Sequence, residues 1–585
     1  MKKYLFGSLA MCLSMSLASC SDDPFEPNND DFKPIESDGK YVGEAVGNFS
    51  KDEWYPGGEL GTTDNVASGC YEDETPAVTA QGLLDDFNAG EKFFERQFTS
   101  GTSGFKGLGP ASVRRSCLDC HPNYGHGKRM DSYTTAYGNG NGYLLAIYHP
   151  KDGANSNDGG YVAEVTGMPQ TQATEPFKAP IDESQINLKW HHVTAMESGI
   201  PMKFPDGEAY DLIYPEITIP RSAFRTNPNP YDTENKAVAV RLESTIGVIG
   251  TGLLDAITED DIKAQYASTA NYYKNVAKVA DVSEYVNPNF WDASANDFAS
   301  GAWYAGTKDA GVYADGGNGK AMIKRFTYAL TRASLQDGPG ANAIWNITNV
   351  TRPDRPKLYT TNAWAAAMAE DKEVIEKIKK DPTSPFWASS DDEISKTVNG
   401  LLQPGTNQFD NEWHNFEPEM SADHFYEFMV WHRGLAIPRA RNLNDERVQR
   451  GKEVFMEIGC NTCHRPSWKT GSDNYWTPNM IAGKPLPRYA NQTIYPYSDM
   501  MQHKLYMIND IHGSWCRTTP LWGRGLAATN GGGVERLHDC RARNEVEAIM
   551  WHAYSKNSHA YDSALKFYNL KKADRDAVVM FLRSI

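Results

Sequence analysis

Two short motifs of cysteine and histidine constrain this chain more than any other feature. Residues 460–464 have the pattern Cys-x-x-Cys-His, and residues 117–121 repeat it. In such a turn, two thiols can form thioethers with the two vinyl groups of one porphyrin, while the adjacent histidine coordinates the iron. The motifs therefore predict two covalently bound haem c groups. The residues expected to hold them are Cys117, Cys120, His121, Cys460, Cys463 and His464.

Three other interpretations of the motifs are a structural zinc site, a thioredoxin-like redox pair and chance. Zinc would need further cysteine or histidine ligands close by, and a thioredoxin-like pair would need a βαβ context. The sequence shows neither pattern around the motifs. Two chance matches are rare in a chain with 9 cysteines and 14 histidines among 585 residues. Haem attachment is the interpretation that explains both motifs.

The first twenty residues have the organisation of a lipoprotein leader. A short basic region precedes a largely apolar run from Tyr4 to Leu17, and the chain then reads Leu-Ala-Ser-Cys up to Cys20. The alternatives are an ordinary cleaved signal or a membrane helix, for which the apolar run is short. We expect residues 1–19 to be removed and Cys20 to carry lipid. This predicts a cell-envelope lipoprotein on the outer membrane, facing the periplasm or the surface.

The charge balance limits the partners of the exported chain. Basic residues number 58 and acidic residues 75, which gives a net charge of −17. Such a balance disfavours nucleic acid and anionic membrane surfaces as partners, so the lipid would be the membrane contact. It favours steering of a small basic cytochrome that gives or takes electrons.

The remaining cysteines are few. Of nine, Cys12 leaves with the leader, Cys20 takes lipid and four hold haem, which leaves Cys70, Cys516 and Cys540. An oxidising compartment would allow a disulfide between Cys516 and Cys540. Cys70 would then stay unpaired.

Length and hydrophobic periodicity indicate a mainly α protein with several domains. We expect two cytochrome c-like haem domains with long loop-rich insertions and a few short strands. The expected divisions are a leader at 1–19, a lipidated tether and irregular segment at 20–80, a first haem domain with a long insertion at 81–350, a helical connecting segment at 351–435 and a second haem domain at 436–585.

A glycine followed four positions later by phenylalanine precedes each motif. Gly90 and Phe94 precede the first, and Gly451 and Phe455 precede the second. The small residue would let its helix approach a neighbour closely. The phenylalanine would pack beside the porphyrin or in the ordinary core. The two haem sites therefore look like related modules.

Two further helices are predicted between the motifs. Residues 363–380 combine alanines with charge pairs such as Glu373 and Lys377, which are typical of a solvated face. Ser421 is a candidate N-cap for a helix that carries His432 on an apolar stripe. We interpret His432 as a partly buried packing residue, with a contact to a haem edge as the alternative.

Several phrases of the chain resemble the di-haem oxidoreductase family, whose members are often labelled peroxidases or thiol oxidoreductases and are related to bacterial di-haem cytochrome c peroxidases. The resemblance runs in order through residues 80–585 and is strongest in the last 150 or so. The phrases are Gly107–Pro110 before Ser116–Cys117, Gly250–Ile257, Leu435–Arg439, Ile494–Asp499, Arg517–Gly523 and Leu537–Asp539 with the residues that follow it.

This resemblance implies two facing helical haem domains, of which one handles electrons and the other binds peroxide. The pattern is broken at Cys540, where relatives usually have glycine, and after His552, where glycine and glutamate residues are usual. Cys516 is also unexpected at its position. The two unusual cysteines flank one segment, which favours their pairing.

The sixth iron ligands decide the chemistry, because an open position admits peroxide and a filled one favours electron transfer. His538 lies where related peroxidases carry a sixth ligand and is the candidate for the second haem. Its competitors are Met500, Met501, Met507, His503 and His552; the candidates for the first haem are His126, His191 and His192. Trp190 is either an ordinary buried aromatic residue or a residue in the space between the haems, and Asp255 and Glu243 are candidates for a distal acid.

We therefore expect a peroxidase-like oxidoreductase that passes electrons between two haems and reduces peroxide or oxidises a partner. One alternative is a di-haem electron-transfer lipoprotein without catalytic activity, and another is maturation of a partner protein by long-range oxidation. A calcium ion bridging the domains is a further option in such an arrangement.

Overall fold

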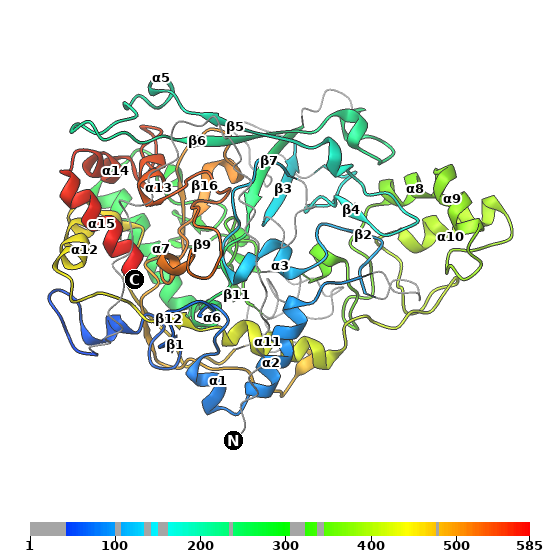
Figure 1. Cartoon of the computed structure of the whole chain (residues 1–585), viewed down its shortest axis with the longest axis horizontal. Helices are drawn as coiled ribbons and strands as arrows, with labels where there is room; N and C mark the ends of the chain where they lie inside the picture. The colour runs from blue at the N-terminus through cyan, green and yellow to red at the C-terminus, as the bar shows by residue number, and fades with distance from the viewer. Residues whose placement is uncertain are drawn as a thin grey trace, which may run out of the picture.

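The computed structural model describes residues 43–99, 107–133, 142–149, 162–232, 238–304, 322–335, 344–475 and 479–585. The predicted leader and lipidation site Cys20 lie outside these ranges. Helices and short strands alternate along the chain (Figure 1). Among the described residues, no helix is both long and apolar enough to cross a bilayer.

Two crossed helix pairs form the centres of the two modules that contain the candidate haem motifs. Each pair combines a helix that precedes a haem motif with a later helix. The first pair is α2 (Leu84–Glu95) with α11 (Ala422–Gly434), and the second is α12 (Glu446–Glu457) with α15 (Lys572–Ser584). The predicted cap of α11 is confirmed, because the Ser421 side chain accepts a hydrogen bond from the backbone N–H of His424.

The glycines sit where the paired helices touch. A Cβ atom added to Gly90 would collide with the carbonyl oxygen of Glu427, and one added to Gly451 would collide with that of Ala577. The next residues met are Trp431 and Phe581, each four positions further along. The expected close approach at both glycines is confirmed, and the modules repeat it residue by residue.

The position of α11 differs from the predicted division of the chain. It lies in the segment expected to connect two domains, yet it packs on α2 as the closing helix of the first module. Figure 1 shows the two side by side. The sequence could not indicate this pairing because more than 300 residues separate the two helices.

Three helices of the predicted connecting segment do form a separate group at one end of the molecule (right in Figure 1). They are α8 (Asn362–Glu370), α9 (Lys372–Lys379) and α10 (Asp391–Leu402), and they share their own apolar cluster. Asp371 separates α8 from α9 because its carboxylate caps α9. The expected pair of Glu373 and Lys377 is present at 3.2 Å.

The insertion of the first module consists largely of two antiparallel strand pairs. They are β3 (Tyr143–Tyr148) with β7 (Ala239–Ser244), and β5 (Asn187–His192) with β6 (Ile213–Thr218). The β5–β6 hairpin extends across the molecule toward the second module (Figure 1). These pairs agree with the expectation of a few short strands in a mainly α protein.

The remaining elements are short. The helices are α1 (Pro76–Ala80), α3 (Cys117–Cys120), α5 (Ala195–Ser198), α6 (Thr251–Asp255), α7 (Glu259–Asn271), α13 (Glu545–Trp551) and α14 (Tyr561–Tyr568). The paired strands are β1 (Thr62–Thr63) with β12 (Ile437–Pro438), β2 (Ala111–Ser112) with β4 (Gln172–Ala173), β8 (Trp291–Asp292) with β9 (Asp297–Phe298), β10 (Trp303–Tyr304) with β11 (Met322–Ile323), β13 (Trp468–Lys469) with β14 (Thr493–Ile494), and β15 (Gln502–Lys504) with β16 (Trp515–Arg517).

The segment expected to be irregular packs on the second module from residue 43 onward. Trp54 is fully buried and donates its indole N–H to the carbonyl of Glu44 at 2.8 Å. Lys452 of α12 forms an ion pair with Glu53 at 2.7 Å. The expectation of loose chain is therefore wrong for residues 43–80, because buried aromatic residues hold this segment in place.

Candidate haem sites and the cavity between them

The two motifs adopt closely similar turns. The first forms α3, and the second forms a 3₁₀ turn over Cys460–Thr462. In each turn the histidine N–H donates to the carbonyl of the first cysteine, at 2.9 Å for His121 and 3.0 Å for His464. Both turns thus bring two thiols and a histidine onto one short peptide, as thioether attachment requires.

Both histidines are oriented as iron ligands. His121 Nδ1 lies 2.8 Å from the carbonyl oxygen of Ile246, and His464 Nδ1 lies 3.0 Å from that of Tyr497. A carbonyl beside Nδ1 fixes the proton there and leaves the lone pair on Nε2 for a metal. Burial lowers the pKa of each imidazole to about 4, so both are neutral at pH 7.

The phenylalanine that precedes each motif lies beside the histidine of that motif. The ring centres of Phe94 and His121 are 6.3 Å apart, and those of Phe455 and His464 are 6.2 Å apart. Phe94 also stacks on Trp431 at 4.1 Å, and Phe455 contacts Phe581 at 5.3 Å. Each phenylalanine therefore supports its histidine and also fills the helix crossing.

A cavity of about 900 Å³ connects the second motif to the first module. Its lining includes Cys460, Cys463 and His464 on one side and Tyr124 and His126, which follow the first motif, on the other. Cofactor pockets in proteins have volumes of roughly 300–1,000 Å³. The cavity is therefore large enough for a cofactor bound at the second motif.

Arg517 provides a chemical test of whether a haem fits this cavity. Its side chain lines the cavity and is buried, and neither Nη1 nor Nη2 has a hydrogen-bond partner. Leaving two donors of a buried guanidinium unpaired is costly, so the site calls for an anionic acceptor. The carboxylate of a haem propionate would supply such an acceptor. The residues present therefore fit a haem group.

His538 lies on the wall of the same cavity, as its assignment as a sixth ligand requires. It is 1% exposed, and neither ring nitrogen has a hydrogen bond. Its Nε2 lies 3.2 Å from Asp510 Oδ1 without hydrogen-bond geometry. Its carbonyl accepts the N–H of Ser244 on β7, so it adjoins the insertion of the first module. Ligation by His538 remains a prediction.

The other sixth-ligand candidates separate by location. His503 and His552 line the cavity, whereas the three methionines Met500, Met501 and Met507 are buried away from its lining. His552 Nδ1 lies 2.7 Å from the carbonyl of Ala548, the same arrangement as in the two motif histidines. His552 therefore joins His538 as a candidate.

The exposed histidines of β5 do not reach a haem site. His191 pairs with Glu216 and His192 with Asp211, both at 2.8 Å on the surface. Trp190 is half-buried and donates to the carbonyl of Met130 at 2.9 Å. None of the three lines the cavity of the second motif, because the hairpin presents this edge to solvent and to its own small core.

His432 is a histidine whose importance the sequence underestimated. It is 3% exposed, and neither ring nitrogen has a hydrogen bond. Burial, and then the nearby His121, lower its pKa to about 3. Trp431 contacts Gly90 in the first module as Phe581 contacts Gly451 in the second. The next residues along the two helices, His432 and Leu582, therefore occupy equivalent positions, and Leu582 lines the cavity of the second module. The apolar helical stripe that carries His432 was the feature of the sequence that could have indicated this buried position.

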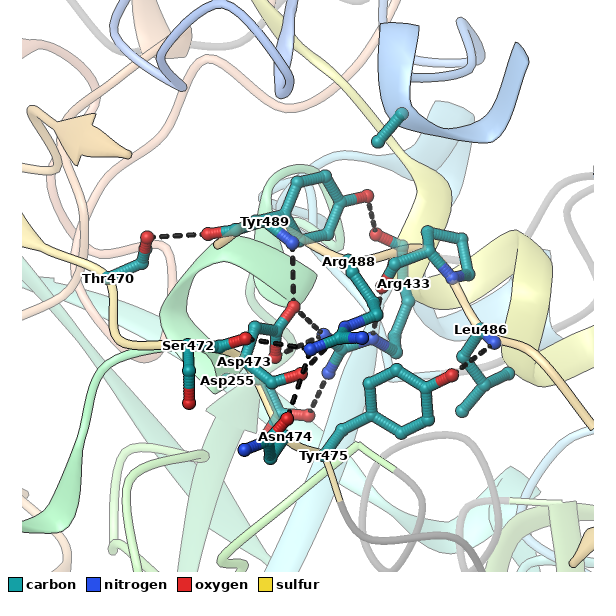
Figure 2. A network of polar contacts seen from close by, with 12 residues as sticks. Asp255, Arg433, Thr470, Ser472, Asp473, Asn474, Tyr475, Leu486, Arg488 and Tyr489 are labelled. Atoms are coloured by element: carbon teal, nitrogen blue, oxygen red, sulfur yellow. Dashed lines mark hydrogen bonds and ion pairs between the residues drawn. The ribbon is translucent and has the colours of Figure 1, made fainter. Parts of the chain in front are cut away.

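Asp255 belongs to a buried ion network and is not a free distal acid. Arg433 binds Asp255 at 2.6 Å and Asp473 at 2.7 Å, and it donates through Nε to the carbonyl of Pro487 at 2.9 Å. Figure 2 shows Arg433 between the two carboxylates. Burial raises the pKa of Asp255 to about 6 despite Arg433. The network connects α11 of the first module to the loop after β13.

Glu243, the other candidate for a distal acid, is absent from the cavity lining.

One cluster could hold a metal ion other than iron. Within the described parts of the chain, only one group of three metal-ligating side chains converges, and it consists of Cys463, Asp499 and His503. His503 Nε2 lies 2.7 Å from Asp499 Oδ2. Zinc would need the Cys463 thiol that haem attachment uses, and the first motif has no similar cluster. A bridging calcium ion gains no support from this group and stays a prediction.

The predicted disulfide is not formed in the structure. Cys516 and Cys540 are both free thiols. Cys540 Sγ lies 3.7 Å from His126 Nδ1, while Cys516 lies on β16 and lines the cavity. Cys540 adopts a φ of 65°, which explains why glycine would suit this position.

The family comparison agrees with this geometry. Residues 401–585 match the family described as "Di-haem oxidoreductase, putative peroxidase". This part of the chain is therefore similar to the di-haem oxidoreductase family. The match contains α11 and the whole second module, including the motif at 460–464. No curated protein matches the chain.

The match to the di-haem oxidoreductase family supports an oxidoreductase with haem cofactors. The first motif, at 117–121, lies outside the matched residues. Its assignment rests on the structural repeat, in which the same glycine contact, phenylalanine position and histidine hydrogen bond recur.

Proposed function

We propose that the protein is a c-type di-haem oxidoreductase that transfers electrons between two haems and reduces hydrogen peroxide at one of them. The observation that carries this proposal is the repeated histidine geometry at His121 and His464, together with the cavity that joins the second motif to the first module. Bound haem iron supplies one-electron chemistry and, where a coordination position is open, binds peroxide.

The residues of the chain support this reaction in three ways. The carbonyls of Ile246 and Tyr497 hold the two proximal histidines in one tautomer. Arg517 offers two unpaired donors to a haem carboxylate. His538 and His552 stand in the cavity with His464, either as a sixth ligand or as a group that moves a proton to or from bound peroxide.

Haem content can be measured with matched cysteine variants. We expect two haems per wild-type chain by mass and by haem spectroscopy, and one in either the C117S/C120S or the C460S/C463S double variant. Cys70→Ala is the control, because Cys70 is a buried cysteine outside both motifs and should leave two haems. One haem in the wild type would contradict the di-haem assignment.

Optical spectra with and without peroxide test the reaction. We expect one high-spin haem in the half-reduced protein, and we expect peroxide to oxidise the haems. The alternative function is a di-haem electron-transfer lipoprotein without catalysis. Two low-spin haems that peroxide leaves unchanged, even after half-reduction, would favour that alternative.

We further propose that Cys20 anchors the protein to the outer membrane and that a small basic cytochrome is its redox partner. The leader pattern and the net charge of −17 support these two points. Cys20→Ser should release the protein from the membrane fraction. Electron exchange with a basic cytochrome should slow steeply as salt concentration rises.

A further inference from the structure

Tyr328 is a buried tyrosine on the wall of the cavity that holds the second motif. It is 5% exposed and lines the cavity together with Cys460, Cys463 and His464. The N–H of Arg517 and the amide of Gln502 both donate to its carbonyl, at 3.0 Å and 2.9 Å. Two bonds from the β15–β16 hairpin thus fix its position.

The phenol of Tyr328 faces a histidine of the first module. Its oxygen lies 3.1 Å from Nε2 of His126, which follows the first haem motif by five positions. His126 Nδ1 lies 2.9 Å from the carbonyl of Gly127, which accepts the N–H bond when the proton is on Nδ1. In this tautomer of the neutral imidazole, Nε2 is the acceptor for the hydrogen bond from Tyr328.

Burial lowers the pKa of His126 well below its usual value, so the imidazole is neutral until the phenol is oxidised, but its surroundings offer an acceptor for a second proton. The carbonyl oxygen of Leu537 lies 2.9 Å from Nε2. A proton arriving on Nε2 would find this acceptor in place, while Nδ1 keeps its bond to Gly127. In the protonated imidazole, each ring nitrogen thus has a carbonyl that accepts its N–H.

The burial of the phenol makes such a base necessary for oxidation. Burial raises the pKa of Tyr328 well above its usual value, so a tyrosinate does not form at neutral pH. Removal of an electron from a neutral phenol makes it a strong acid, and a base within hydrogen-bond distance can then take the proton. His126 is that base.

We propose that Tyr328 is a redox-active relay between the two haems, with His126 as its proton acceptor. The inference rests on the proposed peroxidase function, which supplies the oxidant. Tyr328 gives one electron to the peroxide-oxidised second haem; its O–H bond breaks and an N–H bond forms on His126 Nε2. The products are a neutral phenoxyl radical, an imidazolium and a haem reduced by one electron. One electron from the first haem and the returning proton restore the pair.

Electron paramagnetic resonance of the holoprotein frozen after mixing with hydrogen peroxide tests the relay. We expect a tyrosyl radical in the wild type and at least a tenfold weaker signal in Tyr328→Phe. His126→Gln keeps a hydrogen-bond acceptor without a basic nitrogen and should weaken the signal similarly. Tyr272→Phe is the control, because Tyr272 lines the same cavity but is 50% exposed. Unchanged haem spectra before peroxide show that each variant is folded.

The outcomes separate the two proposals. If peroxide does not alter the haem spectrum of the wild type, the proposed function and the relay both fail. If peroxide oxidises the haems but the radical is absent, or persists in Tyr328→Phe, the relay alone is overturned.

Discussion

The backbone carbonyl of Glu427 lies directly against Gly90, so that a Cβ atom at this glycine would overlap the carbonyl oxygen. Gly451 meets the carbonyl of Ala577 in the same way. The two contacts define equivalent points in the two modules. At each point a glycine lets two helices cross closely enough for one phenylalanine to reach both the crossing and the motif histidine.

Alanine at Gly451 should therefore destabilise the second module, although alanine is the better helix former. Overpacking a close contact typically costs about 1–3 kcal/mol, and we expect this loss in the free energy of unfolding, measured by urea denaturation followed by circular dichroism. Gly405→Ala is the control, because no atom lies within 4 Å of the position of its Cβ. Equal losses in both variants would show that the crossing tolerates a methyl group.

The part of this architecture that the sequence predicted is the part encoded locally. The motif at 460–464, the glycine-to-phenylalanine spacing and the cap at Ser421 each lie within a few residues. The pairing of α2 with α11 could not be predicted, because its partners are distant in sequence and many helices could complete an apolar stripe. The surface position of His191 was hidden for a related reason, since residue type does not tell which edge of a hairpin faces solvent.

The ion network at Arg433 shows the same limit for charges. Asp255 and Asp473 are 178 and 40 positions away along the chain from Arg433, and both reach it only in the folded state. Nothing in the local sequence distinguishes them from surface acids. The network holds α11 against the loop that follows β13, so it bears on how the two modules are fixed relative to each other.

Replacing Arg433 by methionine should leave two buried carboxylates without their cation. Breaking a buried ion pair from one side typically costs about 3–5 kcal/mol, and we expect a loss of this size in thermal or urea unfolding. Removing the charge of the acids as well, in R433M/D255N/D473N, should recover part of the loss. Lys484→Ala is the control, because its pair with Asp423 is exposed. No recovery in the triple variant would contradict a charge-based role.

Glu545 should make stability depend on acid pH. It is buried between Arg536 at 2.6 Å and Arg583 at 2.9 Å. Burial alone would raise its pKa, but the two arginines outweigh burial and hold the pKa at about 2. Because the folded pKa lies below the unfolded one, the stabilisation is complete above about pH 4.5 and is lost as pH falls toward 2.

The matching variant is Glu545→Gln, which should be less stable at pH 7 by about 3 kcal/mol, the equivalent of this shift in pKa. The difference from wild type should shrink between pH 4.5 and pH 2 in unfolding measured at constant salt. Glu453→Gln removes an exposed acid paired with Arg450 at 3.3 Å and should change little at any pH. A constant difference between wild type and Glu545→Gln across this range would contradict the prediction.

Arg517 should set the reduction potential of the second haem. Its two unpaired donors line the cavity that contains His464, and a buried positive charge there favours the reduced iron, which carries one positive charge less. In Arg517→Gln we expect the potential to fall by about 40 mV, which corresponds to about 1 kcal/mol for a one-electron couple. Arg517→Lys keeps the charge and should shift the potential much less. Spectroelectrochemical titration measures both, with covalent haem content unchanged; equal potentials in Arg517→Gln and the wild type would place this guanidinium away from the haem.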